Sequence, residues 1–160
     1  MVGGHRRGSM QRTVIIIGGG ASGLAAAIAA ARAGAQVTVL EAGQRVGAKI
    51  LRTGNGRCNL TNRDISPDDY NDPGFVTSVL ERWGSEEILG FFEELGLLVH
   101  EDSSGRIFPL SDNATSVLDV LRFECAHLGV EVLCRKHVVD IEWLRAGGWD
   151  GRGGRDWDWE

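Results

Sequence analysis

The fold follows from one segment, 13-TVIIIGGGASGLAAAIAAARAGAQVTVLE-41. Thr13–Ile17 is apolar, mostly β-branched and followed by glycines, which is typical of a strand buried on both faces. Ala21–Ala33 is rich in alanine, the best helix former, and Gly34 is a helix stop. Gln36–Leu40 has the composition of a second strand. A strand, a helix and a strand within about 30 residues make a βαβ unit with parallel strands and a right-handed crossover.

The turn between the first strand and the helix carries the pattern GxGxxG at Gly18, Gly20 and Gly23. Because glycine makes up 23 of the 160 residues, this pattern arises by chance in roughly one of two chains of this composition. Its position gives it weight, since it follows a strand, opens a helix, and is succeeded by Glu41 at the end of the next strand. The alternative is an alanine- and glycine-rich core helix that holds no ligand.

Each position of the pattern has a physical role in binding a dinucleotide. Gly18 permits a tight turn, Gly20 lets the backbone approach a diphosphate, and Gly23 lets the helix pack closely on the sheet. The helix N-terminus offers unpaired N–H groups and about half a positive charge to the phosphates. Glu41 can accept hydrogen bonds from ribose hydroxyls and would repel a 2′-phosphate. The unit therefore predicts an α/β, Rossmann-like FAD/NAD(P)-binding fold, and by itself it leaves NAD and FAD open.

The remaining segments predict an incomplete parallel sheet with flanking helices and a small helical segment. Residues 42–72 are polar, rich in Gly and Asn, and read as a long loop that is either functional or disordered. The elements expected after this loop are helices at Phe75–Trp83, Glu86–Leu95 and Ala114–Leu128, and strands or extended pieces at Leu97–His100, Arg106–Leu110, Val130–Cys134 and His137–Ile141. Asn113 is a candidate cap for the last helix, whose apolar stripe contains Val117 and Leu121.

Composition divides the chain into a flexible leader at 1–11, a domain at 12–145 and a disordered tail at 146–160, which holds five Gly and three Trp. A net charge of −5 argues against binding of nucleic acid or an anionic membrane through bulk charge. No apolar run reaches the roughly 18 residues of a spanning helix. The three cysteines have no CxxC spacing, so we expect a protein of a reducing compartment, the cytoplasm, without a metal site.

Two further blocks carry a resemblance to a known family. Residues 47–51 (GAKIL) and 54–62 (GNGRCNLTN) resemble the signature loop of the BaiN-like family of NAD(P)/FAD-dependent flavoproteins. Residues 105–109 (GRIFP), with Ser111, are similar to the family's second block, and residues 129–141 are similar to its following strand pair. Asn55 departs mildly from that pattern, where the family more often has Gly.

The resemblance implies FAD, with its ADP half, diphosphate and flavin end held by different parts of the chain. In the ADP half the implied residues are Gly18, Gly19, Gly20, Ala21, Ser22, Gly23, Glu41 and Ala42, with the backbone of Val138 beside the adenine. Near the diphosphate, ribityl chain or flavin ring they are Lys49, Gly54, Asn55, Gly56, Arg57, Cys58 and Asn59. Alternatively, Arg57 and Asn59 only tie down a long loop, since Asn and Gly are common in loops.

Other reactive side chains give weaker signals. Cys58 invites a redox role, but a small buried thiol is the simpler interpretation because no second cysteine is near it in sequence. His100, Glu101 and Asp102 are adjacent, but neighbouring residues of a strand do not share a face, which favours a solvated loop over a metal or acid–base group. The sequence identifies no catalytic residue.

The expected function is an oxidoreductase that passes hydride from NADH or NADPH through FAD to a small organic acceptor or oxygen. Members of the resembled family are usually more than twice as long as this chain. The alternative is therefore a truncated, non-catalytic nucleotide-binding remnant that self-associates through an exposed sheet edge.

Overall fold

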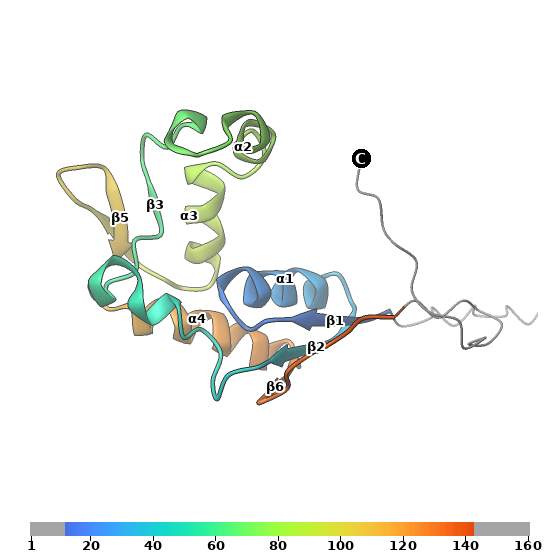
Figure 1. The fold of residues 1–160 in the computed structure, drawn as a ribbon. Helices are drawn as coiled ribbons and strands as arrows, with labels where there is room; N and C mark the ends of the chain where they lie inside the picture. The colour runs from blue at the N-terminus through green and yellow to red at the C-terminus, as the bar shows by residue number, and fades with distance from the viewer. Residues whose placement is uncertain (1–11, 143–160) are drawn as a thin grey trace, which may run out of the picture.

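A parallel three-stranded sheet with two helices forms the base of the computed structural model, which describes residues 12–142 (Figure 1). The leader at 1–11 and the tail at 146–160 lie outside the described residues. The strands follow the order β1-β2-β6, with β1 paired to β2 and β2 paired to β6 in parallel. The elements of this part are β1 (Thr13–Ile17), α1 (Ala21–Arg32), β2 (Gln36–Glu41), α4 (Ala114–His127) and β6 (Glu131–Cys134).

Both helices cover the same face of this sheet. The chain steps from β1 to β2 and from β2 to β6 in the same direction, and right-handed crossovers in one direction put their helices on one side. Leu24 and Ile28 of α1 and Leu121 of α4 are buried together with Val37 and Val39 of β2. The hydrophobic core therefore lies between the sheet and the two helices.

The other face of the sheet is covered by no element among residues 12–142, and we call it the bare face; the prediction that the first strand is buried on both faces is therefore wrong. Ile15 and Ile17 point away from the helices and are 61% and 53% exposed. Val14 and Ile16 point inward and pack against the core. One edge of β1 also pairs with no strand among residues 12–142.

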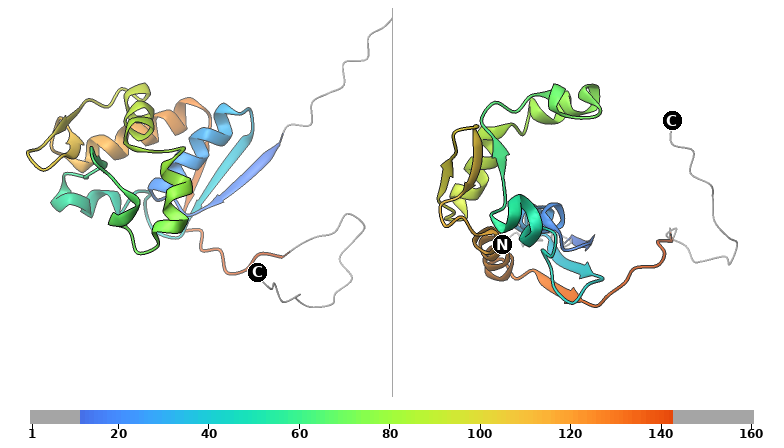
Figure 2. Two further views of the ribbon diagram at one scale, coloured as in Figure 1. Left: turned by 90° about the horizontal axis from the view of Figure 1, so that it is seen from above. Right: turned by 60° about the vertical axis from the view of Figure 1, so that its left-hand side comes forward.

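A smaller lobe is inserted between β2 and α4 and stands beside the sheet (Figures 1 and 2). Three short strands in the antiparallel order β3-β5-β4 form its sheet. The lobe consists of the 3-10 helices η1 (Ile50–Gly56) and η2 (Pro67–Asp69), the strands β3 (Thr61–Asn62), β4 (Val99–Glu101) and β5 (Arg106–Pro109), and the helices α2 (Pro73–Leu80) and α3 (Ser85–Glu94). The sequence predicted both helices to within a few residues, but not β3 or the sheet.

The long loop expected at 42–72 is ordered and partly built into the core. Val46, Ile50 and Cys58 are buried with the other core side chains, and Thr61 is buried at the start of β3. Helix α4 packs against η1, which anchors the first half of this segment. The predicted Asn113 cap is also confirmed, because its Oδ1 accepts a hydrogen bond from the Thr115 N–H at 2.9 Å.

The predicted strand at His137–Ile141 is absent, although β6 itself is present. Arg135 adopts a left-handed conformation (φ 58°), and the chain then leads away from the sheet (Figure 2). The N–H groups of Arg135 and Lys136 donate to the carbonyls of Gly43 and Glu41, each at 2.9 Å. Residues 137–141 pair with no strand of the described chain, and β-branched composition alone does not make a strand.

Candidate cofactor site

The turn from β1 into α1 is fixed by its glycines. Gly18 has φ 97°, and its N–H donates to the Leu40 carbonyl at 2.8 Å, which ties the turn to β2. A Cβ at Gly23 would lie 1.9 Å from the Gly18 carbonyl oxygen, so the helix can approach the turn this closely only with glycine there. The sequence-based roles of these two residues therefore match their geometry.

The start of α1 presents unused hydrogen-bond donors to solvent. Gly20, Ala21 and Ser22 are exposed, and their N–H groups have no hydrogen-bond acceptor among the described residues. A Cβ at Gly20 would meet no atom of the described residues within 4 Å, so the space beside its Cα is open. No acidic residue occupies the first turn of the helix. Free donors and the positive end of the helix dipole together favour an anionic ligand here.

Glu41 lies at the tip of β2 and is bonded to the same turn. Its Oε2 accepts from the Gly19 N–H at 2.8 Å, and its Oε1 accepts from the Gly43 N–H at 2.6 Å. These bonds to Gly43 and then Gly19 lower the pKa of the Glu41 carboxyl, against an opposing effect of burial. Each carboxylate oxygen keeps a further lone pair, which can accept a hydrogen bond from a ligand.

Gly19 has two roles. Its N–H binds the Glu41 carboxylate, and its lack of a side chain lets Val46 of the next loop pack against it. A Cβ at Gly19 would lie 2.3 Å from Cγ1 of Val46, and the Gly19 carbonyl accepts from the Gly47 N–H at 2.7 Å. The site thus consists of an open amide row at 20–22 and a carboxylate held beside it by Gly19. Ala42, the next predicted residue, is exposed next to Glu41.

The second predicted group, residues 54–59, forms a mostly left-handed stretch at the end of η1, interrupted by Arg57 at φ −93°. Gly54, Asn55, Gly56 and Cys58 have φ of 53°, 55°, 84° and 62°. The side-chain amide of Asn59 is oriented with its nitrogen toward the carbonyls of Thr61 and Ile107, to which it donates at 2.8 Å and 3.1 Å. Positive φ at Asn55 and Cys58 costs conformational energy that the surrounding packing must offset, and such strain is concentrated at functional sites.

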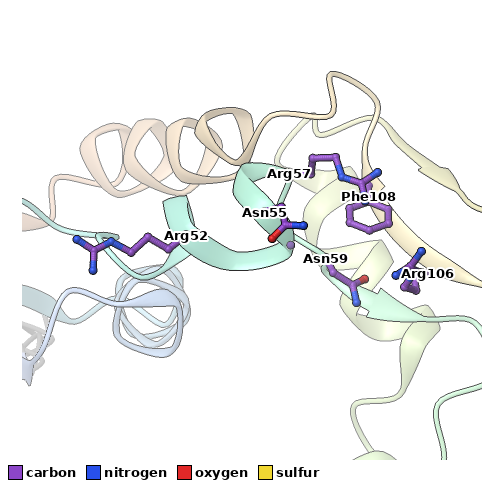
Figure 3. Close-up of a pocket in the computed structure, with 7 residues that line it drawn as sticks. Arg52, Asn55, Arg57, Asn59, Arg106 and Phe108 are labelled. Atoms are coloured by element: carbon purple, nitrogen blue, oxygen red, sulfur yellow. The ribbon is translucent and has the colours of Figure 1, made fainter.

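Gly54, Asn55, Arg57 and Asn59 of this group line an open pocket of about 320 Å³ between η1 and β5 (Figure 3). Its lining is cationic, amide-bearing and aromatic, and comprises Arg52, Gly54, Asn55, Arg57, Asn59, Arg106 and Phe108. The guanidinium carbon of Arg57 lies 4.2 Å from the centre of the Phe108 ring, and that of Arg106 lies 5.8 Å from it. The sequence analysis did not single out Arg52, Arg106 or Phe108, although the GRIFP block contains two of them.

Asp112 joins this pocket to His100. Its Oδ1 lies 3.0 Å from His100 Nε2 and 3.8 Å from an Arg57 nitrogen, and its backbone is left-handed (φ 49°). The neighbours of His100 point to other partners, since Glu101 pairs with Arg63 and Asp102 with Arg106. The three residues therefore do not converge into one group, and Asp112 was not predicted from the sequence as a site residue.

Two other predicted site residues lie apart from both groups. Lys49 is exposed just before η1 and does not line the pocket. Val138 is half-buried, two residues beyond the Lys136 amide that bonds to the Glu41 carbonyl. Cys58 is buried, as the simpler interpretation of that thiol required.

A parallel βαβ unit with free amides at the helix start and a carboxylate at the second strand tip defines a Rossmann-type dinucleotide-binding module. Residues 12–148 match the HI0933-like protein Rossmann domain, and the chain belongs to that family. This agrees with the resemblance to the BaiN-like FAD-dependent oxidoreductases drawn from the loop motifs. The family supports FAD as the dinucleotide.

The chain matches curated relatives over part of their length. It is 50% identical over 121 residues to the 3-dehydro-bile acid delta(4,6)-reductase of Clostridium scindens, which covers 73% of this chain and 29% of that protein. It is 37% identical over 130 residues to the ribosomal RNA dihydrouridine synthase of Haemophilus influenzae, which covers 80% of this chain and 32% of that protein. The chain thus spans about a third of the length of these relatives.

Solved structures share the fold at low sequence identity. An open conformation of a flavocytochrome c3 fumarate reductase superposes with a TM-score of 0.58 at 17% identity, covering 80% of this chain and 27% of that one. A 3-ketosteroid-delta4-(5alpha)-dehydrogenase of Rhodococcus jostii RHA1 superposes with a TM-score of 0.55 at 18% identity, covering 81% of this chain and 39% of that one.

Within residues 12–142, no helix has the length and apolarity needed to cross a membrane.

Proposed function

We propose that this chain is the FAD-binding module of an oxidoreductase that passes hydride from NADH or NADPH through FAD to a small organic acceptor or oxygen. The observation that carries the proposal is the 2.8 Å bond from the Gly19 N–H to Glu41. This bond fixes the carboxylate beside the open amides at 20–22, so sugar and phosphate recognition are adjacent. That combination fits the ADP half of a dinucleotide.

The two groups of residues divide the work of holding FAD. The amides of Gly20, Ala21 and Ser22 would bind the diphosphate, and Glu41 would bind the ribose hydroxyls, with Ala42 and the Val138 backbone toward the adenine. The left-handed stretch at 54–59 and its pocket would face the flavin end. When bound, FAD supplies the hydride chemistry, while the protein supplies binding, orientation and exclusion of water.

The proposed acceptor is a small molecule, and the proposed compartment is the cytoplasm. The relatives include a reductase named for a 3-dehydro-bile acid and a synthase named for dihydrouridine in ribosomal RNA. The net charge of −5 favours the small molecule over nucleic acid, because nucleic-acid affinity depends on cationic contacts to phosphate. The free thiols of Cys58, Cys125 and Cys134 suit a reducing compartment.

The test is to purify the full chain, add FAD, remove unbound cofactor and record the flavin spectrum before and after anaerobic addition of NADH or NADPH. The proposal predicts a yellow protein whose flavin absorption is bleached by one of the two donors. A folded chain that stays colourless would contradict the cofactor, and a yellow chain that neither donor bleaches would contradict the electron donor.

A second candidate is a nucleotide-binding module without catalysis that self-associates through its sheet. The bare face with Ile15 and Ile17, and the open edge of β1, favour it. Exposed strand edges and contiguous apolar surface promote association between copies. A chain that forms oligomers and binds ADP, but leaves FAD unreduced by either donor, is the result this candidate predicts.

A further inference from the structure

The pocket between η1 and β5 is positively charged, although the chain as a whole is acidic. Three arginines are among its lining residues, Arg52, Arg57 and Arg106, and no acidic residue of the described chain is. The whole chain carries a net charge of −5. Two carboxylates lie nearby, Asp102 and Asp112, so the neighbourhood keeps an excess of positive charge. A cationic pocket in an acidic protein attracts small anions and concentrates them locally.

Arg57 is held in place but not neutralised. Its guanidinium lies 4.2 Å from the Phe108 ring centre, a distance at which the cation is attracted to the ring. Asp112 is 3.8 Å away and also bonded to His100 at 3.0 Å, so its charge is shared. The Arg57 side chain remains 41% exposed. A pre-oriented guanidinium loses less entropy when it binds a ligand.

The two other arginines of the pocket lie differently. Arg106 donates to Asp102 through Nε (2.9 Å) and one terminal nitrogen (2.7 Å), which fixes it beside the same ring and leaves its second terminal nitrogen for a ligand. Arg52 also lines the pocket, but its guanidinium lies at the other end of η1 and points away from Arg57 and Arg106 (Figure 3). The amide of Asn55 lies between them and adds a neutral hydrogen-bonding group.

We propose that Arg57, oriented by Phe108 and supported by Arg106, forms a subsite for an oxyanion, a carboxylate or phosphate, of the small-molecule substrate. That the anion belongs to a substrate rests on the proposed function, whereas the binding of an anion at Arg57 does not depend on it. Arginine forks match carboxylate and phosphate oxygens, with two parallel hydrogen bonds. The cofactor's diphosphate has its own donors at residues 20–22, on a different element of the fold.

The test is a titration of the full chain with sodium benzoate and with inorganic phosphate, followed by NMR shifts of backbone amides. Amides of residues 54–59 and 106–108 report the pocket, and amides of residues 20–22 report the helix start. Both titrations are run with and without FAD, and a third uses a short uridine oligonucleotide. The variants are Arg57→Gln, Arg57→Lys and, as matched control, Arg82→Gln, whose side chain is exposed on the turn after α2. Circular dichroism checks that each variant is folded.

The proposal predicts that benzoate and phosphate shift the pocket amides whether or not FAD is present. Arg57→Gln should weaken this binding by about tenfold or more, Arg57→Lys should weaken it less, and Arg82→Gln should not change it. Binding at 54–59 that persists when FAD fails to bind would support the subsite while overturning the proposed function.

Three results would overturn the subsite. The first is equal binding by wild type and Arg57→Gln. The second is loss of anion binding at the pocket when FAD is added, which would assign the arginines to the cofactor. The third is an oligonucleotide that shifts the same amides at lower concentration than either small anion, which would assign the surface to RNA.

Discussion

At the scale of single residues, two glycines of the same turn have different roles. The space at Gly20 is open, so Gly20→Ala should cost the fold about 1 kcal/mol or less, but should weaken FAD binding by tenfold or more because the methyl group fills the approach to the diphosphate. Gly23→Ala should instead destabilise the fold by about 2 kcal/mol or more, since its Cβ would clash with the Gly18 carbonyl.

Thermal unfolding and FAD titration of both variants check this difference. A Gly20→Ala variant that binds FAD like the wild type would refute the role of the open amide. A Gly23→Ala variant of unchanged stability would refute the close packing.

Glu41 should make stability depend on pH. Glu41→Gln keeps one carbonyl-type acceptor for the two amides of Gly19 and Gly43, so it should cost about 1 kcal/mol at pH 7. Because the pKa of Glu41 is lower in the folded chain than in the unfolded chain, the carboxylate stabilises fully above about pH 4.3. That contribution is lost as pH falls through the lower folded-state pKa.

Unfolding measured from pH 7 down to pH 3 for wild type and Glu41→Gln provides the check. The two stability curves should converge at the acidic end. A constant difference across the whole range would mean that the charge of Glu41 is not involved.

At the scale of elements, the left-handed stretch after η1 should tolerate glycine but not a β-carbon without a polar group. Asn55 has φ 55°, so Asn55→Gly should change stability little, while Asn55→Ala should cost about 1 kcal/mol. Both variants keep the pocket arginines. Melting temperatures that rank alanine at or above glycine would show that residue 55 is not held left-handed in solution.

The sequence predicted elements whose signals are local. Gly18, Gly23 and the alanine-rich helix specify β1, α1 and β2 through turn geometry and helix propensity, and the structure confirms these elements. The segments of β4 and β5 were also expected to be extended, but the two-residue strand β3 and the antiparallel pairing depend on contacts between segments far apart in sequence, which no local pattern predicts. His137–Ile141 has the β-branched composition of a strand but no partner within the described residues.

For the candidate site too, the part encoded by a local motif was predicted, and the part that depends on packing between distant segments was not. The open amides and Glu41 follow from one motif within 24 residues, Gly18 to Glu41. The pocket brings residues of η1 together with Arg106 and Phe108 of β5, and that depends on how the inserted lobe packs. Asp112 lies beside Arg57 and His100 with a left-handed backbone, a placement that sequence spacing does not reveal.

At the scale of the whole molecule, the bare face of the sheet should govern association. Ile15→Thr with Ile17→Thr removes apolar surface while keeping β-branched residues in β1, so the double variant should stay folded and associate less than the wild type. The Ile16 side chain packs on the core, so the contrasting variant Ile16→Thr should destabilise the fold by about 1 kcal/mol or more.

Sedimentation velocity over a range of concentrations measures this association. The expectation is a shift toward monomer in the double variant. A wild-type chain that is monomeric at every concentration would show that the bare face does not drive self-association.

A calorimetric titration of FAD into the full chain, with ADP and riboflavin as separate competitors, tests whether the open amides at 20–22 and Glu41 bind the ADP half of the cofactor. The open amides at 20–22 and Glu41 predict that FAD binds and that ADP displaces it, because both share the diphosphate and ribose. A folded chain that binds no FAD, or one from which riboflavin but not ADP displaces it, would contradict the account.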